Sequence, residues 1–120
     1  MSVRIKRIYE SVQRSDGRRI LVDRIWPRGM SKERARIDDW MKSVAPGPEL
    51  RKWFTHEPAK FAHFQEAYQK ELFEDEEKQR SVDQIIQLGR TQTVTLLYAA
   101  KSPTCNHAWV LLQFIHTIKA

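Results

Sequence analysis

The chain has 120 residues and carries 21 Lys and Arg against 15 Asp and Glu, which gives a formal net charge of +6. Hydrophobic residues make up 41% of it and aromatic residues 10%, so its composition excludes a disordered and a collagen-like chain. A chain of this length suits one domain with a packed core. We therefore expect a single domain over residues 1–120.

The cysteine content and the short apolar runs favour a cytoplasmic protein. One cysteine cannot form an internal disulfide, and the first residues have no long apolar segment behind their charges. The longest apolar runs, within residues 94–100 and 108–115, fall far short of the roughly 20 residues that a membrane span needs. We therefore expect a cytoplasmic protein without a transmembrane segment. The histidines and the cysteine lack metal-ligand spacing, so no metal site is expected.

Three segments have the pattern of β-strands. Residues 3–9 alternate over their first four positions, as a strand with one buried face does, and we place them near a sheet edge. Residues 20–25 and 93–100 are β-rich and nearly continuous in apolar character, which predicts interior strands. A turn is expected at residues 15–17, and the first interior strand ends in a loop at residues 26–29.

Four segments favour helices. The apolar spacing predicts a short helix over residues 50–54 and a longer one over residues 58–72. A capping box that starts at Ser81 predicts a third helix, which ends before Gly89. The last helix, residues 106–119, is apolar around much of its circumference and should be largely covered.

Strands separated by helices, two of the strands being apolar on both faces, are typical of α/β proteins. We expect a small, mainly parallel sheet flanked by helices. In such sheets ligands bind beyond the carboxyl ends of the strands, where loops lead into helices. Two segments of this chain meet that description, namely residues 23–29 and 101–107.

Cationic side chains in these two segments predict an anion site. If the two interior strands are neighbours, Arg24, Arg28 and Lys101 converge, and the N–H groups at the start of the last helix also favour an anion. A phosphate or a carboxylate would suit such a site. The chain has no Gly-x-Gly-x-x-Gly or Walker-type loop, which excludes the common dinucleotide and P-loop sites and indicates no cofactor.

His107 is the candidate for chemistry. An imidazole at a helix N-terminus can serve as acid, base or hydrogen-bond donor near pH 7. Alternatively, an Asn-His pair in the first turn caps the helix or packs beneath a loop, and Asn106 suits capping. Cys105 lies beside the same helix start, where a thiolate is stabilised, but no oxyanion device or acid partner accompanies it.

Asp23 and Trp26 each allow two interpretations. Asp23 is a charge in an apolar strand and needs a partner, which Arg24 or Arg28 can supply as a structural ion pair or as neighbours in a ligand site. Trp26 follows the strand beside a proline and an arginine, where it can touch a ligand, although core packing explains most of the four tryptophans.

The surplus of positive charge also allows an acidic macromolecular partner. Six cations crowd the first two strands: Arg4, Lys6, Arg7, Arg14, Arg18 and Arg19. A basic hairpin at this place would bind RNA or DNA through the phosphates, but no nucleic-acid-binding motif accompanies it. A solvated basic face is the simpler interpretation.

Several motifs in fixed order extend over nearly the whole chain. They are Ser15-Asp16-Gly17 before Arg19-Ile20-Leu21-Val22-Asp23-Arg24, Trp26-Pro27-Arg28-Gly29, Asp39-Trp40, Pro48-Glu49-Leu50-Arg51-Lys52-Trp53-Phe54, and Thr95-Leu96-Leu97-Tyr98-Ala99-Ala100-Lys101 before Asn106-His107-Ala108. In these motifs the chain resembles the YeaO-like family, small bacterial proteins within a broader domain family of unknown function. The resemblance implies a compact α/β domain with a three-layer tendency. It also implies a shared pattern that includes Arg24, Arg28, Lys101, Asn106 and His107, and it supplies no established activity.

Three functions follow as hypotheses. The first is an anion pocket at the strand ends for a nucleotide or other phosphorylated metabolite, whose candidate residues are Asp23, Arg24, Trp26, Arg28, Lys101 and Asn106. In its enzymatic form two cations hold the anion, Trp26 covers it, and His107 acts in a hydrolase- or transferase-type step. The second is a non-catalytic nucleic-acid-binding module, and the third is a protein-interaction domain without a small ligand. The sequence indicates no oligomeric state.

Overall fold

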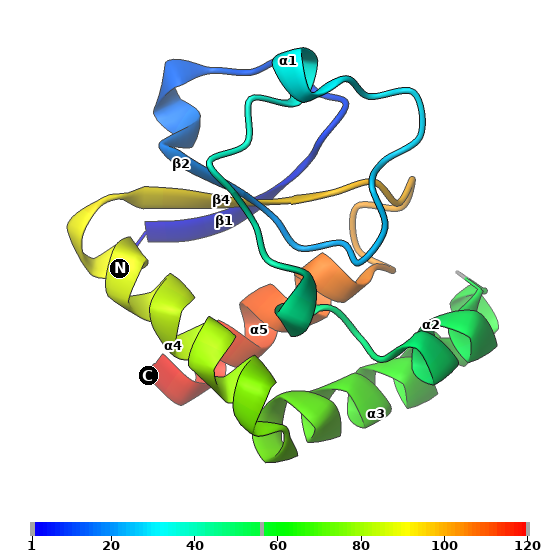
Figure 1. The fold of residues 1–120 in the computed structure, drawn as a ribbon. Helices are drawn as coiled ribbons and strands as arrows, with labels where there is room; N and C mark the ends of the chain where they lie inside the picture. The colour runs from blue at the N-terminus through cyan, green and yellow to red at the C-terminus, as the bar shows by residue number, and fades with distance from the viewer. Residues whose placement is uncertain (1, 56, 120) are drawn as a thin grey trace.

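The computed structural model describes residues 2–55 and 57–119 and contains a four-stranded parallel sheet (Figure 1). The strands are β1 (Ser2–Arg7), β2 (Arg18–Leu21), β3 (Asp39–Trp40) and β4 (Thr93–Tyr98). They lie in the order β1-β4-β2-β3, and β1 pairs with β4, β4 with β2, and β2 with β3, in each case in parallel. The predicted α/β fold with a small parallel sheet flanked by helices is confirmed.

The positions of the strands agree with the sequence in two respects and differ in one. β1 lies at an edge, and β2 and β4 are interior neighbours in which Leu21 is opposite Leu97. The prediction of a basic hairpin from the first two strands is wrong, because β4 lies between β1 and β2. The hydrophobic runs decide this order, since β4 is buried along Val94 to Tyr98 and takes a central place.

β2 is shorter than predicted. Its regular pairing ends at Leu21, although the N–H of Val22 still donates to the carbonyl of Leu97 at 3.0 Å. Beyond that point the carboxylate of Asp23 accepts the N–H of Ala99 at 3.0 Å, so that a side chain takes the place of a backbone carbonyl. The strand therefore ends where Asp23 enters, and the loop predicted at residues 26–29 follows it.

Five α-helices are present in the described part of the chain. They are α1 (Lys32–Ala35), α2 (Pro48–Phe54), α3 (Phe61–Glu74), α4 (Glu76–Thr91) and α5 (His107–Lys119), and a 3-10 turn at Pro58–Lys60 leads into α3. The predicted short helix, long helix and last helix correspond to α2, α3 and α5. β3 and α1 lie in a segment to which the sequence assigned no element.

The predicted start and end of the third helix are wrong. α4 begins at Glu76, because the carboxylate of Asp75 accepts the N–H of Lys78 at 3.1 Å and caps the helix. Ser81 lies inside α4, where its hydroxyl is 2.7 Å from that of Ser43. The helix also continues through the buried Gly89 to Thr91, since tertiary packing outweighs the helix-breaking tendency of one glycine.

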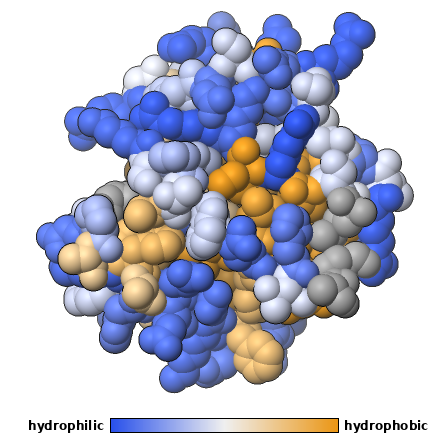
Figure 2. All heavy atoms as spheres, turned by 180° about the vertical axis from the view of Figure 1, so that it is seen from behind, coloured by the Kyte–Doolittle hydropathy of each residue, from blue (hydrophilic) through white to orange (hydrophobic). Residues whose placement is uncertain are grey.

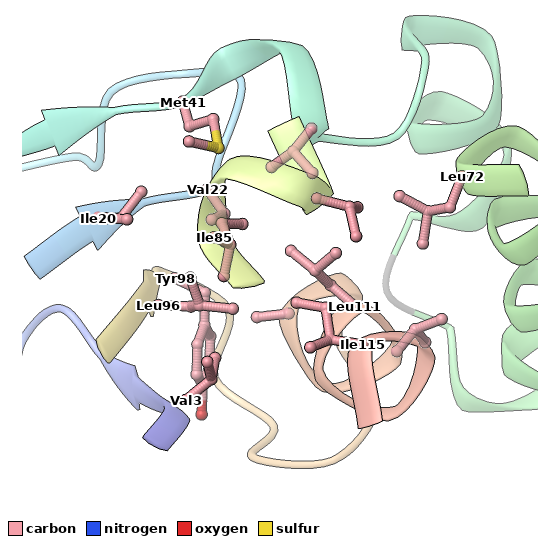
Figure 3. Close-up of a cluster of buried hydrophobic side chains, with 14 of the residues drawn as sticks. Val3, Ile20, Val22, Met41, Leu72, Ile85, Leu96, Tyr98, Leu111 and Ile115 are labelled. Carbon is pink, nitrogen blue, oxygen red and sulfur yellow. The ribbon is translucent and has the colours of Figure 1, made fainter. Parts of the chain in front are cut away.

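The main core lies between the sheet and the helices α3, α4 and α5 (Figure 3). β2 and the residue after it alternate, so that Ile20 and Val22 join this core while Leu21 joins a second cluster on the opposite face. That opposite face is covered by α1 and the loops around it (Figure 1). The sheet is thus covered on both faces, in keeping with the three-layer tendency that the resemblance implies.

The turn before β2 requires a glycine. Gly17 has φ of 64°, and a Cβ at this position would collide with the carbonyl group of Thr93. The close approach lets the hydroxyl of Thr95 donate to the carbonyl of Asp16 at 2.6 Å. The turn predicted at residues 15–17 is confirmed, and it attaches the start of β2 to β4.

Hydrophilic side chains cover much of the face seen from behind in Figure 2. Apolar side chains gather near the middle of this face, and paler apolar areas lie at the left and at the lower edge of the view. Among the described residues, the exposed large apolar side chains are Val12, Ile25, Trp53, Phe73 and Ile118. None of the helices formed by residues 2–55 and 57–119 is long and apolar enough to cross a membrane.

Candidate functional site

The carboxyl ends of β1, β4 and β2 meet at one edge of the sheet, on the right in Figure 1. The segments that follow these strands form two hollows there. Ala99 and Ala100, directly after β4, line both hollows and separate them. We refer to them as the larger hollow, of about 840 Å³, and the smaller cavity, of about 120 Å³.

The larger hollow is cationic. Its lining residues are Arg7, Tyr9, Arg28, Pro58, Ala99, Ala100, Lys101, Ser102 and Cys105. Three of these nine carry a positive charge and none is acidic. Among the residues that the structure describes, Arg7, Arg28 and Lys101 form no ion pair with a carboxylate, so their charge is available to a bound anion.

Arg7 and Tyr9 form a fixed wall of the larger hollow. The Nε atom of Arg7 donates to the carbonyls of Ala99, at 3.2 Å, and Ala100, at 3.0 Å, and its guanidinium carbon lies 4.6 Å from the centre of the Tyr9 ring. The Tyr9 hydroxyl donates to the carbonyl of Arg28 at 2.7 Å. These contacts connect β1, β4 and the loop after β2, and they leave the exposed side chains of Arg28 and Lys101 at the mouth.

The smaller cavity has an aromatic floor and a cationic rim. Phe54 of α2 and Phe64 of α3 are buried and stack with ring centres 4.2 Å apart. Arg24 and Arg51 line the same cavity, and the Nε of Arg24 is 3.4 Å from the carbonyl of Pro46. Like the cations of the larger hollow, these two arginines form no ion pair within the described part of the chain.

Asp23 and His107 form a pair at the inner wall of the smaller cavity. Nε2 of His107 lies 3.1 Å from the carbonyl oxygen of Val22 and 3.0 Å from Oδ1 of Asp23, and both side chains are about six-sevenths buried. Both neighbours of Nε2 are acceptors, so this nitrogen carries a proton. The hydrogen bond of Nε2 is to the carbonyl of Val22, and Oδ1 of Asp23 is a buried carboxylate oxygen that lies beside Nε2 without a hydrogen bond.

The Asp23–His107 pair connects five segments: the chain after β2, the chain after β4, β3, α3 and α5. Oδ2 of Asp23 accepts the N–H of Ala99 at 3.0 Å, and its backbone carbonyl accepts the indole N–H of Trp40 at 2.7 Å. The ring of His107 lies edge-on to Tyr68 of α3, 6.4 Å between centres. Burial, followed by the charges of Glu71 and Asp23, raises the pKa of Tyr68 well above its usual range, so its hydroxyl stays protonated and donates to a backbone carbonyl.

The partner of Asp23 differs from the one that the sequence suggested. The sequence offered Arg24 or Arg28 for an ion pair, and the structure pairs Asp23 with His107. The reason is the end of β2, where Asp23 points toward the start of α5 while Arg24 reaches Pro46 and Arg28 lines the larger hollow. His107, the residue that the sequence offered for chemistry, thereby has structural contacts at Nε2.

Trp26 lines neither hollow. Its indole N–H donates to the carbonyl of Met30 at 2.6 Å, and its ring meets that of Trp40 edge-on with centres 5.3 Å apart. Both rings pack against the cluster that contains Ile8 and Leu97. Trp26 therefore shapes the loop after β2, and the described contacts place it in the second core.

Asn106 caps α5, as the sequence predicted. Its side-chain oxygen accepts the N–H of Trp109 at 2.8 Å, and its side-chain amide donates to the carbonyl of Ser102 at 2.7 Å. The Ser102 hydroxyl accepts the N–H of Cys105 at 2.9 Å. Asn106 is fully buried, so its polar atoms serve the turn before α5.

The cations of the first two strands are largely engaged within the protein. Lys6 and Arg19 contact the carboxylate of Asp16, at 3.0 and 2.5 Å, and Arg18 contacts that of Asp39 at 2.8 Å. Arg19 is almost completely buried. This part of the basic surface therefore offers less free charge to nucleic acid than the sequence suggested.

The structure thus divides the predicted site in two. It places Arg28 and Lys101 at the larger hollow and Asp23, Arg24 and His107 at the smaller cavity. The lining residues that sequence reasoning missed include Arg7, Tyr9 and Arg51. Arg7 is the last residue of a parallel strand and Tyr9 follows it, so the rule that pointed to residues 23–29 would also have found them, while nothing in the sequence singles out Arg51.

Comparisons with known proteins identify relatives along almost the entire chain. Residues 2–119 match the family model described as the inactive DUF488-N3 subclade. The chain is 41% identical to the uncharacterised protein YeaO of Escherichia coli K12 over 118 residues, which cover 98% of this chain and 100% of YeaO. It is 39% identical to the uncharacterised proteins Mb3100c of Mycobacterium bovis and Rv3073c of Mycobacterium tuberculosis, over 95% of this chain and 93% of each relative. No solved structure shows significant similarity.

Proposed function

The chain belongs to the inactive DUF488-N3 subclade and is similar to YeaO along its length, and we propose that it binds a nucleotide or another small phosphorylated molecule in the larger hollow. The observation that carries the proposal is a hollow at the carboxyl end of a parallel sheet that is lined by three cations and no acid; none of these cations has an ion pair among the described residues, and two of them, Arg28 and Lys101, are exposed. Such edges are the usual ligand sites of α/β proteins. A phosphate there gains charge-assisted hydrogen bonds from Arg28 and Lys101.

The proposal is for binding without turnover. His107 and Asp23 face the smaller cavity and hold β2, β4 and α5 together, whereas Arg28 and Lys101, which would hold the phosphate of this proposal, line the larger hollow. The description of the subclade as inactive agrees with this division of roles. The step in which His107 acts as acid or base stays a prediction, as does the cytoplasmic location.

Replacement of Arg28 and Lys101, the two exposed cations at the larger hollow, by alanine tests the proposal. We expect Arg28→Ala combined with Lys101→Ala to weaken binding of inorganic phosphate, pyrophosphate and AMP by about tenfold for each cation removed, because a hydrogen bond to a charged group contributes roughly 1.5–3 kcal/mol. Isothermal titration calorimetry at low ionic strength measures the loss. Thermal shift, in which ligands of the native state raise the midpoint, provides an independent reading.

The matched control removes the same charge elsewhere. Arg80 and Arg90 are exposed on α4, and Arg80→Ala combined with Arg90→Ala should leave the affinities unchanged. Absence of binding by all three anions, or equal affinity in the two double variants, contradicts the proposal. Binding only of a single-stranded oligonucleotide, with a steep loss of affinity as salt rises, would instead support a nucleic-acid module.

A further inference from the structure

The smaller cavity has a positive charge of its own, which a phosphate bound in the larger hollow would not contact. Arg24 and Arg51 line it from the loop after β2 and from α2, on the far side of Ala99 and Ala100 from the larger hollow. Neither forms an ion pair within the described residues. Five cations therefore surround one short piece of chain, three on one side and two on the other.

The acid in the smaller cavity does not neutralise these arginines. Asp23 directs one carboxylate oxygen to the N–H of Ala99 and the other to His107, at 3.0 Å each. Oδ1 is inaccessible to solvent, and Oδ2 already accepts the N–H of Ala99, so the carboxylate offers a ligand in the cavity at most one oxygen that is already hydrogen-bonded. The rim is thus positive, and a second anionic group is the chemistry that matches it.

The floor limits how far a ligand can extend. Phe54 and Phe64 are buried and stacked, and they close the inner side of the cavity. With a volume of about 120 Å³, the cavity holds one small group and its immediate attachment. A terminal anion suits these dimensions, whereas a polymer that continues beyond the cavity does not.

We propose that the ligand carries two anionic groups and lies across Ala99 and Ala100, with one group in the larger hollow and the other between Arg24 and Arg51. The inference rests on the proposed function, because it needs the first group to bind at Arg28 and Lys101. It assigns the ligand class as a small bis-anion, such as a metabolite or nucleotide phosphorylated at both ends. Both hollows share Ala99 and Ala100, so one molecule can reach both without a change in the fold.

A homologous series of ligands tests the span. The probes are α,ω-alkane bisphosphates of increasing chain length, each compared with the alkyl monophosphate of the same length by calorimetry at fixed ionic strength. Once the first phosphate binds, the second meets its site intramolecularly, at an effective concentration near the millimolar range. We expect the best bisphosphate to bind about tenfold or more tightly than its monophosphate, and the gain to peak at one length and fall on both sides.

Two sets of variants localise the gain. Arg51→Ala, and separately Arg24→Gln, should remove most of the gain of the bisphosphate and leave the monophosphate affinity within about twofold, since only the second group contacts them. The control Arg80→Ala removes an exposed charge on α4 and should change neither affinity. Circular dichroism of each variant shows that the fold is retained, and Arg51 is exposed, so its loss leaves no buried gap.

The outcomes separate this inference from the proposed function. A gain that peaks with length and disappears in the Arg51 and Arg24 variants supports a bis-anion. Monophosphate binding that depends on Arg28 and Lys101, with no further gain for a bisphosphate of any length, overturns the inference and leaves the proposed function intact. A gain that persists in both variants also overturns it, and the absence of binding by all members of both series overturns the two together.

Discussion

Asp16→Asn is expected to lower the free energy of unfolding by about 3–5 kcal/mol, because it leaves a buried guanidinium and an ammonium without their counter-charge. Arg19 is 3% exposed and its Nη1 atom lies 2.5 Å from Asp16, while the Nζ of Lys6 lies 3.0 Å from the same carboxylate. Asp16 also accepts the N–H of Gln13 at 3.0 Å. The amide of asparagine keeps the shape of the side chain and removes its charge.

The loss of stability in Asp16→Asn should depend on pH. Burial alone would raise the pKa of Asp16, but the N–H of Gln13 and the charges of Lys6 and Arg19 outweigh it and hold the pKa below its usual range. The charged carboxylate therefore stabilises the fold above the unfolded-chain pKa of about 3.9, and this contribution disappears as the pH falls through the lower folded pKa. The variant should accordingly differ most from the wild type near neutral pH and least in strong acid.

Urea unfolding at several pH values measures the difference. Asp83→Asn is the matched control, because Asp83 is exposed on α4 and its exchange should alter the free energy of unfolding by less than about 0.5 kcal/mol. Equal stability of the wild type and Asp16→Asn at neutral pH, or a difference that grows toward acid, would contradict the account of this cluster.

His107→Ala is expected to lower the free energy of unfolding by about 2–3 kcal/mol. The substitution removes the partner of a carboxylate oxygen that has no hydrogen bond, and it frees the carbonyl of Val22. It also removes a ring that packs on Tyr68. The result matters for function, because a side chain kept for catalysis at the expense of the fold would leave stability unchanged or raise it when removed.

A double-mutant cycle isolates the pair. Asp23→Asn, His107→Ala and the double variant should show a coupling energy of about 1–2 kcal/mol, since each partner loses less when the other is already absent. His116→Ala is the control, as His116 is exposed on the same helix. Additive effects of the two substitutions would mean that the pair does not hold β2 and α5 together.

The sheet was largely predictable because hydrophobic runs decide which strands are central. The segments 20–25 and 93–100 are apolar on both faces, and they occupy the interior positions. β3 was not predictable, because it is only Asp39 and Trp40, held by pairing with β2 and by no pattern of its own. The start of α4 was misplaced because Ser81 matches a cap locally, while Asp75 makes the actual capping bond.

The sequence predicted where in the fold the candidate residues lie, but not which of them lie together in one cavity. The rule for carboxyl ends of parallel strands pointed to the edge where the two hollows lie and to five of their charged and polar lining residues, Asp23, Arg24, Arg28, Lys101 and His107. It could not foresee that Ala99 and Ala100 divide that edge, nor that Asp23 turns to His107. Both features depend on the path of the loop after β2. That path is held by contacts between residues far apart in the sequence, such as the hydrogen bond from the indole N–H of Trp40 to the carbonyl of Asp23.

The most direct test of anion binding at the larger hollow is a ¹H–¹⁵N NMR titration of the wild-type protein with pyrophosphate. The account predicts saturable shifts of the backbone signals of residues 99–102 and of Arg7, Tyr9 and Arg28, with the ends of α4 unchanged. Saturable shifts confined to Arg4, Arg14 and Arg18, or no saturable shift at all, would contradict it.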